Sequence, residues 1–213
     1  MRTDDLIDAL SERLEPVSTH APFWRLGAWV GGGAVVSAVL MLLVLGLRPD
    51  MASAMGALMF WTKFAYTLAL GGLALWAAER LGRPGAKASL PLTVVVVVVV
   101  LFALLATGQL MMAPPPMRHH MLMGHSAQVC PCLILALAVP LLVGTVMGLR
   151  GFAPTRPMLT GLAGGLAAGG LAAFVYAFSC NESAMPFVAV WYTLPVLAAG
   201  LIGAVVGRFA LRW

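Results

Sequence analysis

The sequence predicts an all-α, polytopic membrane protein with six transmembrane helices and a short amphipathic helix before them. Of its 213 residues, 61% are apolar and only 10% are charged, a composition outside the range of soluble domains. Six apolar segments approach or reach the roughly 20 helical residues that cross a bilayer. Lys and Arg gather on alternate sides of these segments, as in membrane proteins of defined orientation.

The first fifteen residues hold five of the eight carboxylates and two arginines, which gives a net charge of 2 − 5 = −3. Thr3 can cap a helix here and Pro16 ends it. Leucines spaced four residues apart give this acidic helix an apolar stripe, whereas helices bound to anionic lipid carry Lys and Arg. We therefore predict that residues 1–22 are a cytoplasmic segment that binds a protein partner; the alternatives are a solvated tail or a helix docked on the protein's own loops. The expected contact residues are Asp4, Asp5, Leu6, Ile7, Leu10 and Leu14.

The rest of the chain, residues 23–213, is predicted to form one transmembrane domain. Its third span contains seven consecutive valines, 94–100, which in water favour a strand. In lipid a single strand leaves its backbone polar groups unpaired, so a helix is expected. The fourth span is the shortest and carries Pro140, which predicts a kink. The six predicted spans are residues 26–47, 55–78, 90–110, 133–149, 158–178 and 187–206.

Glycines recur every fourth residue in the last two spans, at Gly161, Gly165 and Gly169 and again at Gly203 and Gly207. Small residues at this spacing favour close approach of two helix backbones. The alternative is that glycine is simply common in membrane helices.

The distribution of basic residues predicts the orientation. With a cytoplasmic N-terminus, ten of the thirteen Lys and Arg residues lie inside, two lie outside, and Lys63 lies within a span. Both termini are then cytoplasmic. The first span is too long, and its preceding region too acidic, for a cleaved signal peptide. The inside residues are Arg2, Arg13, Arg25, Arg80, Arg83, Lys87, Arg150, Arg156, Arg208 and Arg212.

All three cysteines, Cys130, Cys132 and Cys180, fall in loops or at span ends on the predicted outer side. Cys130 or Cys132 can meet Cys180, because both regions reach the same membrane face. A Cys-Pro-Cys string is too tight for an unstrained disulfide between its own cysteines, and three cysteines leave one unpaired. The alternative is a set of inert buried thiols.

A methionine- and histidine-rich loop before the fourth span is the candidate metal site. His119, His120 and His125 lie in it, and with Cys130 and Cys180 they make a ligand set suited to a soft metal such as Cu(I). No fixed ligand spacing is satisfied, and methionine is also a common filler of interfacial loops. We expect no resident cofactor, and a heavy-metal ion only as a signal.

Lys63 lies inside the second predicted span, and an intramembrane charge is a functional-site hypothesis by default. The alternatives are that it snorkels to the outer interface or pairs with Asp50 or Glu182. Beyond residue 15 only Asp50, Glu79 and Glu182 are acidic, and the sequence has no phosphate-binding glycine loop or catalytic triad. An enzyme is therefore not expected.

Several unusual strings occur along the whole chain: residues 2–7, 47–50, 60–63, 124–126, 130–131, 149–157, 179–180, 186–193 and 211–213. In these strings the chain resembles the NrsF family of bacterial inner-membrane anti-sigma factors, which restrain extracytoplasmic-function sigma factors. The resemblance implies six membrane helices and a cytoplasmic N-terminal segment that holds the sigma factor. It also implies that Cys130 and Cys180 matter for sensing, with Cys132 an extra.

The expected function is that of an anti-sigma factor in the bacterial inner membrane. It sequesters an extracytoplasmic-function sigma factor and releases it when a periplasmic oxidant or heavy metal alters the cysteines. Its expected partners are the sigma factor and the lipid bilayer, without direct contact to nucleic acid, because its basic residues are scattered. The rival functions are a thiol redox protein of the inner membrane, for which a second dithiol is missing, and a soft-metal transporter.

Overall fold

A computed structural model describes residues 3, 21–86 and 88–212. All regular structure within these residues is helical, and six segments are long and apolar enough to cross a membrane. This confirms the predicted all-α fold with six transmembrane helices. The spans are α2 (Ala21–Val44), α4 (Leu58–Gly82), α5 (Ser89–Met112), α7 (Cys130–Leu149), α8 (Pro157–Tyr176), and the pair α9 (Met185–Trp191) and α10 (Thr193–Ala210); α3 (Met51–Ala54) and α6 (Pro115–Met123) are short.

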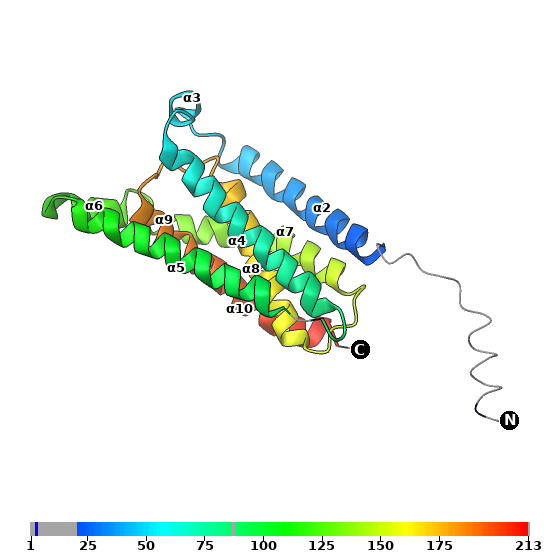
Figure 1. Cartoon of the computed structure of the whole chain (residues 1–213). Helices are drawn as coiled ribbons and strands as arrows, with labels where there is room; N and C mark the ends of the chain where they lie inside the picture. Colours follow the sequence, from blue (N-terminus) through cyan, green and yellow to red (C-terminus); the bar gives the residue numbers. More distant parts are fainter. Residues whose placement is uncertain (1–2, 4–20, 87, 213) are drawn as a thin grey trace.

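The six spans lie side by side and alternate in direction, so that the molecule has two ends (Figure 1). One end holds the start of α2 and the C-terminus of the chain. The opposite end holds α3, α6 and α9, together with the start of α7 and the end of α8. We call this second end the cysteine end, because Cys130 begins α7 and Cys180 follows α8.

The fourth span begins earlier than the sequence predicts. Helix α7 starts at Cys130, whereas the sequence predicts a start at residue 133, so Cys130 and Cys132 lie in its first turn. Pro131 fits there because backbone N–H groups in the first turn of a helix have no partner within the helix, so the N–H that proline lacks is not needed. Pro140 lies within α7 and does not end the helix.

Helix α8 is the most buried of the six spans and packs mainly on α4 and α10. Its glycines permit this approach. A Cβ added at Gly161 would collide with the carbonyl oxygen of Gly203 in α10, and one at Gly165 would also meet the α10 backbone. On the other side, a Cβ at Gly170 would lie 2.7 Å from the Cα of Gly71 in α4. The predicted close packing at these glycines is thus confirmed.

Candidate functional site

Two buried thiols meet at the cysteine end. The Sγ atoms of Cys130 and Cys180 are 3.9 Å apart although the residues are 50 positions apart in sequence. Both are free thiols; Cys130 is fully buried and Cys180 is 5% exposed. Cys132 is exposed, and its sulfur lies 3.9 Å from the carbonyl oxygen of Gln128. Of the two pairings that the sequence left open, the structure therefore brings Cys130, not Cys132, to Cys180.

Hydroxyl groups surround the thiol pair. The Sγ of Cys130 lies 3.0 Å from the hydroxyl oxygen of Tyr176 and 3.2 Å from Ser126 Oγ. Tyr192 is fully buried, and within the described residues its hydroxyl has no hydrogen-bond partner. A hydrogen bond from this hydroxyl to Cys180 would act to lower the pKa of that thiol. An unpaired buried hydroxyl is destabilising by about 1–3 kcal/mol, so it is a candidate donor to a charged sulfur.

Lys63 brings a buried positive charge to the same place. Its side chain is 1% exposed, and Nζ donates to the carbonyl oxygens of Cys180 at 2.9 Å and Glu182 at 3.0 Å. The ammonium also lies 5.9 Å from the centre of the Tyr192 ring. Of the predicted partners, Glu182 is found through its backbone rather than its carboxylate, and the Asp50 carboxylate is bound elsewhere.

The thiol of Cys180, which lies in the loop after α8, is acidified by these neighbours. The hydrogen bond from Cys130 and then the ammonium of Lys63 lower its pKa to about 6, against burial, which acts to raise it. A thiol with this pKa is mostly thiolate at pH 7. The thiolate is the form that attacks oxidants and binds soft metals.

Arg48 ties the loop after α2 to the loop that carries Cys180. Its guanidinium forms two hydrogen bonds of 2.7 Å with the Asp50 carboxylate and reaches the carbonyl oxygen of Cys180 at 3.5 Å. The hydrogen bond with Asp50 raises the pKa of Arg48 and lowers the pKa of Asp50. The Arg48 backbone N–H donates to the carbonyl oxygen of Phe178, and Ser179 Oγ donates to that of Gly46. Side-chain and backbone hydrogen bonds with residues 46–48 thus hold the loop that carries Cys180, which we call the thiol loop.

The predicted metal ligands do not gather in one cluster. Nowhere in the described part of the chain do three or more His, Cys, Asp or Glu residues form a group that could hold a metal ion. Instead His120 and His125 form one pair, with their Nε2 atoms 3.2 Å apart, and Cys130 and Cys180 form another. His119 is an exposed residue of α6.

Comparison with known proteins shows which family this chain resembles. The family described as "NrsF: Negative regulator of sigma F" matches residues 10–213. The chain belongs to the NrsF family. It is 42% identical over 214 residues to the anti-sigma-F factor NrsF of Caulobacter vibrioides (strain NA1000 / CB15N) and covers all of it. It is 36% identical over 213 residues to the probable anti-sigma-F factor NrsF of Azospira oryzae (strain ATCC BAA-33 / DSM 13638 / PS), again over the whole length of both chains. No solved structure matches.

Membership of the NrsF family confirms the resemblance drawn from the sequence strings and indicates a regulatory rather than a catalytic role. The predicted partner-binding residues of this NrsF-family chain, Asp4, Asp5, Leu6, Ile7, Leu10 and Leu14, lie outside the described residues. The three cysteines, the three histidines of the predicted metal site and Lys63 are the predicted site residues that the structure describes.

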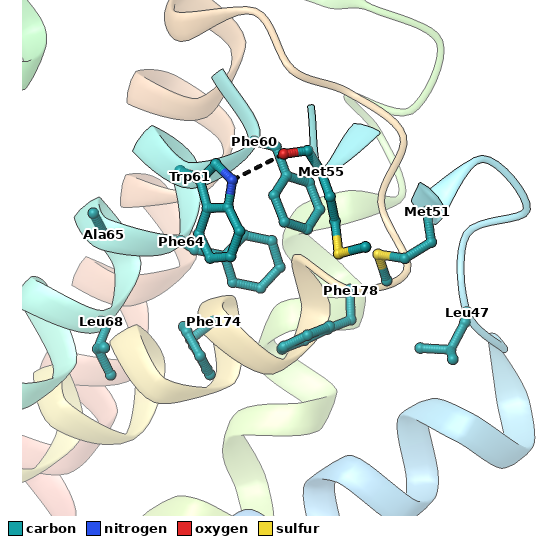
Figure 2. A pocket seen from close by; sticks show the side chains of 10 residues that line it. All are labelled: Leu47, Met51, Met55, Phe60, Trp61, Phe64, Ala65, Leu68, Phe174 and Phe178. Carbon is teal, nitrogen blue, oxygen red and sulfur yellow. Dashed lines mark hydrogen bonds between the residues drawn. The ribbon is translucent and has the colours of Figure 1, made fainter. Parts of the chain in front are cut away.

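An apolar groove at the cysteine end is a second candidate site in this NrsF-family chain. It has a volume of about 820 Å³, and Figure 2 shows the thioethers of Met51 and Met55 beside the ring of Phe178. The Trp61 indole N–H donates to the carbonyl oxygen of Met55 at 3.0 Å. No acid, base or nucleophile lines the groove, so it offers no chemistry of its own. Its lining residues are Leu47, Met51, Met55, Phe60, Trp61, Phe64, Ala65, Leu68, Phe174 and Phe178.

Sequence reasoning missed Arg48, Tyr176 and Tyr192 as parts of the thiol site. The sequence predicts Arg48 as a charge outside the membrane and as part of the string 47–50, and its Arg-Pro-Asp spacing is compatible with the pair that it forms with Asp50. Tyr176 lies four residues before Cys180, but nothing in the sequence indicates that it faces Cys130, because that contact joins two different helices.

Proposed function

We propose that this chain is a membrane-bound anti-sigma factor with a redox-sensitive thiol pair. Its N-terminal segment binds a sigma factor of the extracytoplasmic-function type, and a change at Cys130 and Cys180 lowers the affinity for that partner. The names of the two relatives support the sigma factor as partner. The single observation that carries the sensing role is the pair of free, buried sulfurs 3.9 Å apart beside Lys63.

The proposed orientation places both termini in the cytoplasm and the cysteine end in the periplasm of a bacterial inner membrane. The bias of ten inside basic residues against two outside supports this orientation. The cysteine end lies opposite the start of α2 and the C-terminus (Figure 1). Thiols in the periplasm can be oxidised to disulfides, whereas thiols in the cytoplasm are kept reduced.

The proposed sensing reaction is a two-electron oxidation by a peroxide. The Cys180 thiolate attacks an oxygen of a hydroperoxide, ROOH, and with one proton gives a sulfenic acid and ROH. The Cys130 thiol then displaces the sulfenic oxygen, which leaves as water, and a disulfide forms. A heavy-metal ion bound by the two sulfurs is the alternative stimulus. Either event removes the free thiolate beside Lys63.

Disulfide formation shortens the distance between the two sulfurs from 3.9 Å to about 2.05 Å. Cys130 is the first residue of α7, so the bond pulls the start of α7 toward the loop after α8. Side-chain rotation takes up part of this change, and the helices take up the remainder.

Helix α7 is tightly packed on α2, which offers a route to the N-terminal segment. A Cβ at Gly144 would collide with the carbonyl oxygen of Trp29, and one at Gly148 would lie 2.7 Å from a Leu26 methyl. Ser37 Oγ in α2 donates to the carbonyl oxygen of Leu137 in α7 at 2.8 Å, so a buried hydrogen bond also joins these two helices. Helix α2 begins at Ala21, at the end of the proposed binding segment, residues 1–22. A tenfold loss of sigma-factor affinity needs a coupling free energy of only about 1.4 kcal/mol.

Co-purification of the full chain with its sigma factor tests the binding role. Leu10→Asp puts a charge in the predicted apolar stripe and is expected to abolish recovery of the partner. Ala9→Asp adds the same charge beside the stripe and is the matched control, for which recovery is retained. Equal recovery with the Leu10 variant and the wild-type chain contradicts the proposal.

Release of the bound sigma factor by hydrogen peroxide tests the sensing role separately. Cys130→Ser and Cys180→Ser are expected to keep the partner bound in oxidant. Cys132→Ser, the matched control, is expected to release it as the wild-type chain does, because Cys132 lies outside the buried pair. Release from the Cys180 variant at the wild-type rate rules out the thiol pair as the sensor.

A further inference from the structure

Helix α6 is held firmly at the cysteine end. The Trp191 indole N–H in α9 donates to the carbonyl oxygen of Leu122 at 2.8 Å. The guanidinium of Arg118 donates to the carbonyl oxygens of Ala113 at 3.0 Å and Met111 at 3.1 Å, at the end of α5. These bonds fix the position of α6 relative to two spans, so its exposed side chains are presented in a defined place.

The turn after α6 folds the chain back over the last turn of that helix. The N–H of Gly124 donates to the carbonyl oxygen of His120 at 2.8 Å, and Gly124 has a φ of +50°, in the region that favours glycine. A Cβ at this glycine would lie 2.6 Å from the carboxyl carbon of Glu182. Glu182 in turn accepts the backbone N–H of His125 at 2.7 Å. The carboxylate therefore sets the direction in which the chain leaves α6.

As a result the imidazoles of His120 and His125 converge. Their Nε2 atoms are 3.2 Å apart, the ring planes meet at 77°, and both residues are exposed. Two nitrogens bound at 2.0–2.1 Å to a tetrahedral Zn²⁺ lie about 3.3 Å from each other. Two neutral rings with their protons on Nδ1 thus offer two lone pairs at the spacing of two zinc ligands.

We propose that His120 and His125 form a two-nitrogen site for a late transition-metal ion that favours tetrahedral coordination, Zn²⁺ in the first place, with water completing its coordination. Imidazole suits Zn²⁺ well, whereas a soft Cu(I) ion prefers sulfur. The site is separate from the Cys130–Cys180 pair and uses none of the sulfurs. Binding replaces the single hydrogen bond between the two rings with two metal–nitrogen bonds, and both ring protons then reside on Nδ1.

The proposed site is linked to the thiol loop through Glu182. The carboxylate of Glu182 holds the backbone of His125, and its carbonyl oxygen accepts a hydrogen bond from Lys63. Lys63 also holds the carbonyl oxygen of Cys180. An ion that fixes the histidine turn therefore also restrains the loop beside the reactive thiol.

Titration of Zn²⁺ into the full chain in lipid nanodiscs, with binding measured by calorimetry, tests the site. A background with all three cysteines changed to serine removes the thiol ligands, and Zn²⁺ alone is the probe. One ion per chain is expected to bind. His120→Ala and His125→Ala are each expected to weaken binding at least tenfold. His119→Ala, an exposed neighbour in α6, is the matched control and is expected to change the affinity less than twofold.

A second measurement distinguishes loss of the metal site from misfolding of a variant. In the same background Co²⁺, a visible substitute for Zn²⁺, is expected to show the intense absorption of tetrahedral coordination, and each histidine variant is expected to lose it while keeping its helical circular dichroism. Equal Zn²⁺ affinity in all variants, or equal loss with His119→Ala, means that the rings form only a hydrogen bond and overturns the proposal. Neither measurement needs a sigma factor or an oxidant, so failure here leaves the proposed function untouched.

Discussion

Replacing Lys63 by methionine gives the sharpest test of the thiol site. Methionine has a similar length and no charge, so Lys63→Met removes the ammonium that helps to hold the Cys180 thiolate. With a pKa of about 6 the thiol is roughly 90% ionised at pH 7, whereas at its ordinary value of 9.0 it would be about 1% ionised. Loss of Lys63 removes one of the two main causes of this difference, so we expect an intermediate pKa, at least about one unit above the wild-type value.

The assay is the rate of alkylation by iodoacetamide as a function of pH, read for each cysteine by mass spectrometry. In the wild-type chain the midpoint for Cys180 is expected near pH 6, and in the Lys63→Met variant it moves upward. Cys130→Ala is expected to move it further, because the hydrogen bond from Cys130 is the largest cause of the low pKa. Cys132 is exposed and serves as the internal control, with an unchanged profile.

Two further observations complete the test. Lys63→Arg keeps the positive charge and is expected to restore much of the low midpoint, which a merely structural role of Lys63 would not predict. Removing Lys63 takes one hydrogen bond from each of two carbonyl oxygens, and that of Cys180 keeps only its 3.5 Å contact with Arg48. A buried carbonyl left unpaired costs about 1–3 kcal/mol, so each variant needs a thermal unfolding control. An unchanged midpoint for Cys180 in a folded Lys63→Met protein refutes the reasoning.

Two other predictions concern stability, with thermal unfolding in detergent as the measurement. Gly165→Ala forces a methyl group into the α10 backbone and is expected to destabilise the fold by about 1–3 kcal/mol. Gly72→Ala is the control, because its added Cβ meets nothing within 4 Å. This control variant is expected to have unchanged or raised stability. A Gly165 variant as stable as the Gly72 variant contradicts the packing described for α8 and α10. Tyr192→Phe removes a buried hydroxyl without a described partner and is expected to leave stability unchanged or raise it by up to about 1–3 kcal/mol. A clear loss of stability in this variant means that the hydroxyl has a partner, the candidate being the Cys180 sulfur.

Much of the fold follows from the sequence because lipid imposes a simple rule. A segment such as the valine run 94–100 has no other way than a helix to satisfy its backbone in a bilayer, and the structure places it within α5. The glycine spacing in α8 likewise identifies a packing surface without any knowledge of the partner helix. Helix ends are less well predicted, since α7 extends to Cys130 through a proline that fits the first turn.

The site follows from the sequence only in part. The sequence by itself determined the helices, the bias of charge across them, the chemical kinds of the reactive residues and the family to which the chain belongs, because these depend on composition and local spacing. Only the tertiary structure decided that Cys180 meets Cys130, that Lys63 binds the Cys180 loop through its backbone, and that His120 faces His125. The physical reason is that helix rotation and loop direction are set by packing between distant segments. A single glycine turn or a buried hydrogen bond then selects which side chains share a site.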